Sequence, residues 1–157
     1  MKAASVKELK LALSERSHKE LLEICLRLSK FKKENKELLT YLLFEASDEE
    51  AYIASVKRAI DQQFEQINTK SYYFIKKSVR KILRAVKKYI RYSRKKETEV
   101  ELLLHFCHQL QAMHPPFTRN KVLKSLYQRH IDMIKKKIES LHEDLQYDYE
   151  LELKELG

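Results

Sequence analysis

The chain has 157 residues, of which 43% are apolar and 35% charged, and one domain of this length buries enough surface to fold without a disulfide or metal. With one Gly and two Pro it lacks the turns that hairpin-rich sheet proteins need, so the composition excludes most architectures with tight turns and indicates an all-α protein. The net charge is +9, no run of eighteen apolar residues occurs, and the N-terminus lacks a signal-peptide core, so we expect a cytoplasmic protein outside the membrane.

Several helix starts are marked by a Ser or Thr that is followed three positions later by Glu. In this capping box the two side chains satisfy each other's free backbone N–H groups at the start of a helix. The pairs are Ser5/Glu8, Ser17/Glu20, Ser47/Glu50 and Thr98/Glu101. Each pair precedes a run of apolar residues at helical spacing, so we expect a helix to begin at each.

The first part of the chain predicts four helices. The third is apolar nearly all round, so we expect it to be buried on several sides. Cys25 and Cys107 each lie among apolar residues, which predicts two buried free thiols in a reducing cytosol. The predicted ranges are 6–13, 18–31, 37–44 (with Asn35 as its N-cap) and 48–67.

The segment from Lys70 to Lys96 holds twelve Lys and Arg and no Asp or Glu, so it carries +12 while the rest of the chain carries −3. It predicts a helix over residues 71–93, roughly 34 Å long. Placed at about 100° intervals, its apolar residues share one third of the circumference. The opposite side carries Lys76, Lys77, Arg80, Lys81, Arg84, Lys87, Lys88 and Arg91, with Tyr73 among them.

The last part of the chain predicts two more helices around a break. The helix over 99–113 is apolar in most directions, so we expect it at the centre of the fold. The His-Pro-Pro-Phe sequence at 114–117 ends it, because neither proline donates a helical N–H. The final helix begins after Thr118 or Asn120 and runs to about Tyr147, and residues 148–157 are expected to fray.

About seven helices joined by short turns therefore form one domain over residues 1–157. Short connections make successive helices antiparallel. We expect an irregular stack of antiparallel helical hairpins, either a bundle or a short solenoid-like array. The oligomeric state is left open.

The basic helix is the strongest functional feature of the sequence. Regularly spaced cations neutralise phosphates and release condensed counterions, Arg binds phosphate with two hydrogen bonds, and Tyr73 or Tyr92 could stack on an unpaired base. We therefore expect a non-enzymatic protein that binds nucleic acid or another polyanion. The alternative is a protein-interaction scaffold whose basic helix pairs with an acidic protein or a second copy. A solvated face balanced by Glu139, Glu143, Asp144 and Asp148 would carry no function.

No catalytic, cofactor or metal site is predicted. Glu101, His105 and His108 share one helix face at a spacing that three metal ligands use, but zinc needs a further ligand and a second shell, so hydrated surface side chains are the preferred interpretation. No nucleophile elbow and no Gly-rich phosphate loop occurs, so we expect no enzyme.

Four segments together resemble a family of small uncharacterised bacterial all-helical proteins, found mainly in Bacteroidetes-type genomes. They are S-V-K-E-L-K-L-A-L at 5–13, S-H-K-E-L-L-E-I at 17–24, E-A-Y-I-A-S-V-K at 50–57 and S-V-R-K-I-L-R-A-V-K-K-Y at 78–89. The resemblance implies an all-helical cytoplasmic protein without an assigned activity, and it carries over no site residues. The His-Pro-Pro-Phe break departs from that pattern.

Overall fold

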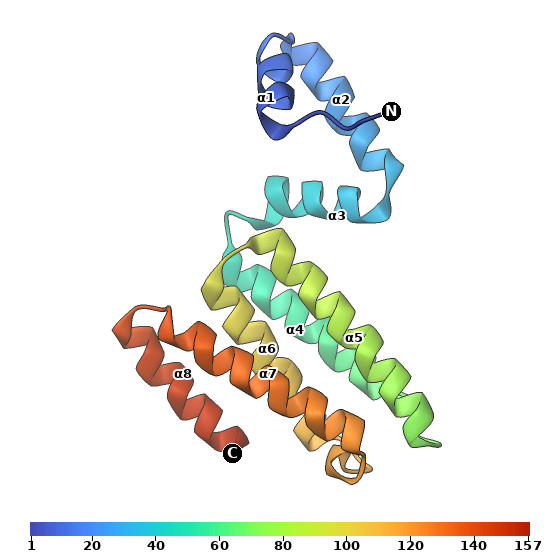
Figure 1. Cartoon of the computed structure of the whole chain (residues 1–157), viewed down its shortest axis with the longest axis vertical. Helices are drawn as coiled ribbons and strands as arrows, with labels where there is room; N and C mark the ends of the chain where they lie inside the picture. The colour runs from blue at the N-terminus through green and yellow to red at the C-terminus, as the bar shows by residue number, and fades with distance from the viewer. The chain divides into compact units, whose positions relative to one another are not determined.

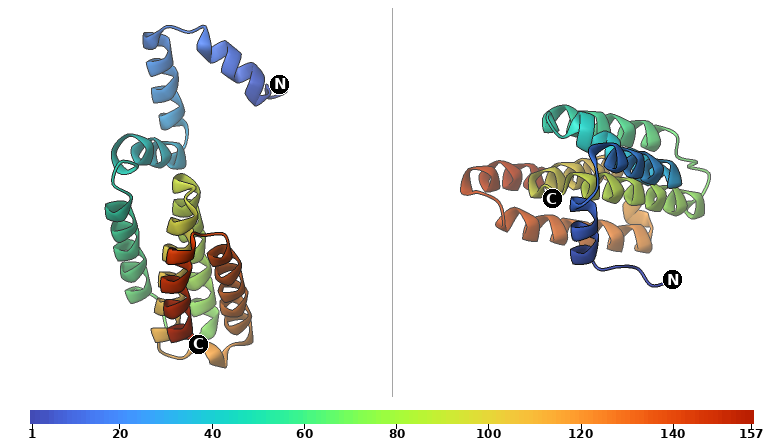
Figure 2. Two further views of the ribbon diagram at one scale, coloured as in Figure 1. Left: turned by 90° about the vertical axis from the view of Figure 1, so that its left-hand side faces the viewer. Right: turned by 90° about the horizontal axis from the view of Figure 1, so that it is seen from above.

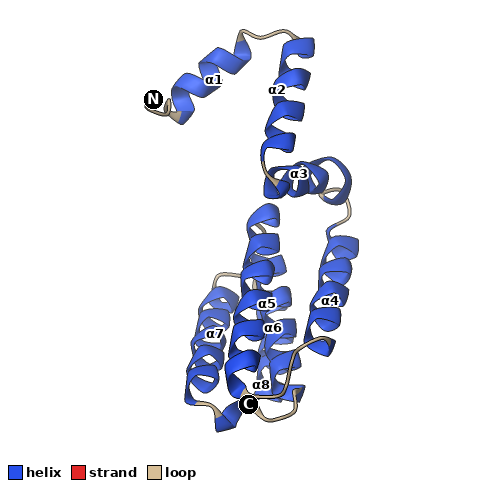
Figure 3. Cartoon of the chain, turned by 90° about the vertical axis from the view of Figure 1, so that its right-hand side faces the viewer, coloured by secondary structure: helices blue, strands red, loops and turns tan.

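A computed structural model describes residues 1–157 and shows a protein built of helices alone (Figure 1). The all-α prediction is confirmed, with eight α-helices where about seven were expected and no strand anywhere in the chain (Figure 3). The helices are α1 Val6–Ser14, α2 His18–Phe31, α3 Lys33–Thr40, α4 Glu49–Glu65, α5 Tyr72–Ser93, α6 Lys96–Ala112, α7 Lys121–Glu139 and α8 Glu143–Leu156. A π-helical turn, Tyr41–Glu45, follows α3, and a 3-10 turn, Phe117–Arg119, precedes α7.

The chain divides into two compact units, residues Met1–Phe44 and Glu45–Gly157, where the sequence led us to expect one domain. In the first unit, α2 packs against α3. The capping boxes of Ser5 and Ser17 are both present, as predicted. The Asn35 cap is wrong, because α3 begins at Lys33 and the Asn35 amide donates to the Leu28 carbonyl instead.

The first unit leaves its apolar residues largely exposed. The segment over 37–44 was expected to be buried on several sides, yet Phe44 is 73% exposed and only Tyr41 is buried. Cys25 is also exposed, which corrects the prediction of a buried thiol, whereas Cys107 in the second unit is buried as predicted. Three short helices have too little surface to bury one another's apolar residues. In this unit, apolar residues at helical spacing are therefore not a sign of burial.

The second unit is organised around α6, as the sequence predicted. This helix packs against α4, α5, α7 and α8, whose ribbons lie side by side in two further views (Figure 2). Eight of its residues are buried, and they point in most directions around its axis. Phe106 is fully buried and lies against Phe64 of α4, with ring centroids 5.7 Å apart.

Two capping boxes of the second unit are wrong. Helix α4 is capped by Asp48, whose carboxylate accepts from the Ala51 N–H, and not by Ser47. Thr98 lies inside α6, where its hydroxyl donates to Glu49 at the start of α4. A tertiary partner therefore takes the hydroxyl that local spacing assigned to a cap.

Helix α5 is the most strongly amphipathic helix of the chain. Its predicted apolar stripe is confirmed, since Ile75, Val79 and Val86 are fully buried. It ends at Ser93, and the next residue, Arg94, adopts the left-handed conformation with φ 62° and donates its N–H to the Ile90 carbonyl. The basic helix is thus held by the core along one side.

The C-terminal segment differs most from expectation. The predicted single helix is interrupted at Ser140, and α8 begins after an N-cap at His142. Residues 148–156, expected to fray, form most of α8, in which Tyr149 and Leu156 are buried. The Leu156 carbonyl accepts from Tyr127 and from Gln111, which fixes the end of the helix.

Candidate polyanion-binding groove

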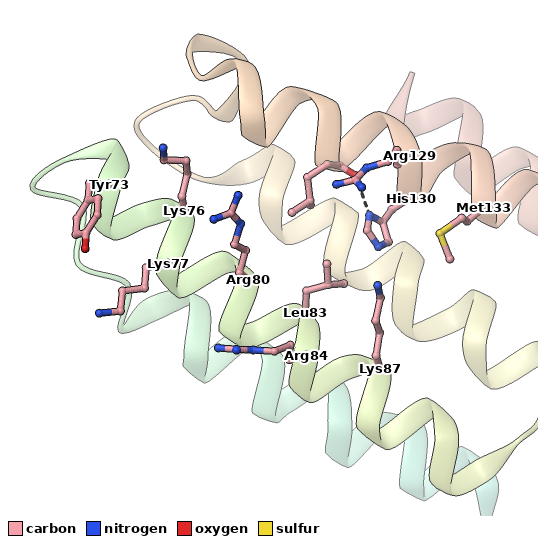
Figure 4. A pocket seen from close by; sticks show the side chains of 11 residues that line it. Tyr73, Lys76, Lys77, Arg80, Leu83, Arg84, Lys87, Arg129, His130 and Met133 are labelled. Carbon is pink, nitrogen blue, oxygen red and sulfur yellow. Dashed lines mark hydrogen bonds between the residues drawn. The ribbon is translucent and has the colours of Figure 1, made fainter.

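A groove of about 620 Å³ lies between α5 and α7, with α6 packed against both helices. In Figure 4, Lys76, Arg80 and Lys87 reach from α5 toward α7. We call this feature the cationic groove. Its lining residues are Tyr73, Lys76, Lys77, Arg80, Leu83, Arg84 and Lys87 from α5, and Leu126, Arg129, His130 and Met133 from α7.

The structure brings together most of the residues that the sequence singled out. Tyr73, Lys76, Lys77, Arg80, Arg84 and Lys87 all line the cationic groove. Lys81, Lys88 and Arg91 do not line it. Lys88 instead lies over the ring of Tyr89, with its Nζ 5.1 Å from the ring centroid. Six of the nine positions that the sequence singled out therefore lie along the groove.

No acidic side chain lines the groove, although six cations do. None of the six groove cations forms an ion pair or a side-chain hydrogen bond within the chain. The acids that would have balanced them, Glu139, Glu143, Asp144 and Asp148, form no ion pair with α5. The six cations that line the groove are therefore not neutralised by ion pairs within the fold.

The floor of the groove is apolar and contains one histidine. Leu83, Leu126 and His130 are 7%, 4% and 4% exposed, and Met133 lies beside them. His130 Nδ1 lies 2.7 Å from the Leu126 carbonyl oxygen, and since that oxygen can only accept, Nδ1 carries the hydrogen. His130 Nε2 is the one buried side-chain nitrogen or oxygen in the chain without a hydrogen-bond partner.

The surroundings of His130 keep its ring neutral. Burial lowers the pKa of the imidazole, the bond to the Leu126 carbonyl opposes that shift, and the charges of Lys87 and Arg129 lower it further. In the neutral ring with Nδ1 protonated, Nε2 presents a lone pair. Leaving a buried acceptor unpaired costs about 1–3 kcal/mol, so the unpaired Nε2 of His130 lowers the stability of the fold.

Several charged residues between α4, α6 and α8 have partners within the fold. Glu101 accepts from Lys57 Nζ at 2.7 Å and from the Tyr149 hydroxyl at 2.9 Å. His105 Nε2 lies 2.5 Å from Asp61. Burial, the bond to Glu101 and the charges of Glu101 and Glu97 raise the pKa of Tyr149. The face that carries Glu101, His105 and His108 thus joins α6 to α4 and α8.

The α7 contribution to the groove was missed in the sequence. Leu126, Arg129, His130 and Met133 follow helical spacing and form a stripe next to the buried stripe that was recognised. Because a histidine and a methionine follow a leucine at helical spacing, they indicate a second face of α7 that contacts other residues. The sequence offers no sign that this face borders α5.

Comparison of the chain with protein-family models, with curated proteins and with solved structures gives no match. None of its helices is both long and apolar enough to cross a membrane.

Proposed function

We propose that this protein is a non-enzymatic binding protein whose cationic groove binds nucleic acid or a similar polyanion. One observation carries the proposal: six Lys and Arg side chains line one groove without an acidic residue among them. Cations that pair within the fold stabilise it, whereas cations gathered without partners repel one another. Such an arrangement is stabilised when an anionic ligand supplies the missing charge.

The groove also suits phosphate binding in its chemistry and size. Arg80, Arg84 and Arg129 offer planar guanidinium groups that can bind phosphate oxygens through two hydrogen bonds each. The volume of about 620 Å³ falls within the range of roughly 300–1,000 Å³ that is usual for ligand sites. We assign no catalytic residue, because the groove brings no carboxylate, thiol or Ser or Thr hydroxyl beside His130.

The test is binding of labelled DNA and RNA, and retention on heparin, at about 50 mM salt and at higher salt. If all six cations contact phosphates of a duplex, affinity should fall roughly 10³-fold between 50 and 200 mM salt. Absence of binding to nucleic acid and to heparin at the lower salt would refute the proposal. It would leave the alternative of a scaffold whose groove receives an acidic protein or a second copy.

Three further proposals concern the whole chain. We propose that the helices form an irregular stack of antiparallel hairpins, based on the short turns between successive helices. We also propose that the chain is cytoplasmic, since its two cysteines are free. We further propose that the chain is related to a family of small bacterial all-helical proteins, on the basis of the segments at 5–13, 17–24, 50–57 and 78–89.

A further inference from the structure

The cationic groove contains one group that a phosphate cannot satisfy. His130 Nε2 is a buried hydrogen-bond acceptor without a partner, and the charged side chains that line the same groove are all donors. Phosphate oxygens only accept hydrogen bonds when the phosphate is ionised. A ligand that matches the whole groove must therefore bring an N–H or O–H donor in addition to its negative charge.

The arrangement of the groove separates these two requirements in space. Its rim carries Lys76, Arg80 and Arg129, whereas its floor carries Leu83, Leu126 and His130 (Figure 4). The floor residues are nearly buried and two of them are wholly apolar. A flat apolar ring with a polar edge suits such a floor, while phosphates suit the rim.

We propose that the cationic groove binds an unpaired nucleotide of a single strand, with its phosphates on the rim and its base on the floor, where an N–H of the base edge donates to His130 Nε2. This inference rests on the proposed polyanion-binding function and names its ligand. Every nucleobase carries an N–H on its Watson–Crick edge. In a duplex that edge is already paired and stacked, so the double strand cannot reach the floor.

Access to His130 requires only side-chain movement. Nε2 has almost no contact with solvent in this structure. Lys87 and Met133 flank the ring in Figure 4, and Met133 is 44% exposed. Both side chains are long and unbranched, and Lys87 forms no ion pair that would hold it in place.

A strand is favoured over a free nucleotide by the length of the groove. Tyr73 and Lys87 are fourteen positions apart on α5, which corresponds to about 21 Å along the helix axis. Tyr73 is 65% exposed at one end of the groove, where a second base could stack on its ring. One nucleotide cannot contact both ends.

The test compares three labelled ligands of equal length, about twelve nucleotides, by fluorescence anisotropy with the full chain. They are a single strand of mixed sequence, the same strand with abasic sites throughout, and the corresponding duplex. We expect the single strand to bind about tenfold more tightly than the abasic strand, since contacts to a base contribute to affinity beyond its phosphate. We expect the duplex to bind no better than the abasic strand.

His130→Phe keeps an apolar ring on the floor but removes the acceptor, and His130→Gln restores an acceptor oxygen. We expect His130→Phe to lose most of the preference for the intact strand without weaker binding of the abasic strand, and His130→Gln to recover part of it. Circular dichroism establishes that each variant is folded. If neither variant folds, the comparison of intact and abasic strands on the natural chain still decides the proposal.

The outcomes separate this inference from the proposed function. Equal binding of intact and abasic strands would overturn the base contact while polyanion binding stands. Displacement of the strand by an equal concentration of mononucleotide would overturn the assignment to a strand. Absence of binding to all three ligands and to heparin would instead remove the proposed function itself.

Discussion

Charged side chains are arranged in opposite ways on two sides of the second unit. Where α4 packs against α5 and α6, charged and polar groups meet in pairs: Glu49 accepts from the hydroxyls of Ser93 and Thr98, and Glu101 accepts from Lys57. Between α5 and α7, six cations line a groove without one acid. Charges of the first kind hold helices together. The groove cations form no such pairs and therefore do not stabilise the fold. We assign them to the binding of a ligand for this reason.

The stability of the contacts that α4 makes with α5 and α6 should depend on single acidic side chains. The largest effect is expected at Glu49. Glu49→Ala leaves the nearly buried hydroxyls of Ser93 and Thr98 without their acceptor and removes the ion pair to Lys95. We expect the free energy of unfolding to fall by about 3 kcal/mol, as measured by urea denaturation. The matched control is Glu50→Ala, an exposed acid on the same helix turn, which should change stability by less than about 0.5 kcal/mol.

A smaller loss should follow removal of the charge at Glu101. Glu101→Gln keeps an acceptor for the Tyr149 hydroxyl but leaves Lys57 without its counter-charge. Because both side chains of the pair are partly solvated, we expect a loss of about 1–2 kcal/mol in the same urea experiment. An unchanged midpoint would mean that the pair is no more than a surface contact.

On the groove side, His130 should make stability depend on pH. Its pKa is lowered in the folded state, so the unfolded chain binds a proton first as the pH falls. With respect to this group, the free energy of unfolding is highest above about pH 6.5, and it decreases as the pH falls below that value. Between pH 7 and pH 5 the free energy of unfolding of the natural chain should fall further than that of His130→Phe. Identical pH profiles would show that the ring is not protected from protonation.

The smallest effect is expected where cations of the groove are reversed. Arg80→Glu combined with Arg84→Glu removes no ion pair and relieves repulsion among the remaining cations. We expect the free energy of unfolding to change by less than about 0.5 kcal/mol, or to rise slightly. A loss of stability as large as that of Glu49→Ala would contradict the division between the two sides, because it would make these arginines structural partners.

The sequence predicts one wall of the groove but not the other. The acid-free run in α5 and the clean separation of its two sides can be found by helical periodicity alone, and the structure keeps both. Arg129 and His130 lie in a helix of ordinary composition. Only the packing of α5 and α7 on α6 brings them to the groove that the cations of α5 line. Periodicity locates a face but not its neighbour.

Two other differences have the same physical origin. Thr98 has the spacing of a helix cap, yet Glu49 from another helix captures its hydroxyl. The break at Ser140 contains no Gly or Pro. The local sequence indicates it only by a change of charge, from Lys136 and Lys137 to Glu143 and Asp144. Basic residues suit the end of one helix and acidic residues the start of the next. Long-range partners and weak caps decide both positions, and neither is visible in a hydrophobic pattern.

The central claim, that the groove cations and not the general positive charge of the chain bind the polyanion, is tested by the salt dependence of single-strand binding. Two variants carry the same change of charge: Arg80, Arg84 and Arg129 each replaced by Gln, and Arg27, Arg58 and Arg119 each replaced by Gln as the control outside the groove. We expect the groove variant to bind about 100-fold more weakly, and its slope of log affinity against log salt to be shallower by about 2, because each lost phosphate contact removes about 0.7. The control should keep the affinity and slope of the natural chain. Equal losses in the two variants would contradict the claim, since the charge of the whole molecule, and not the groove, would then account for binding.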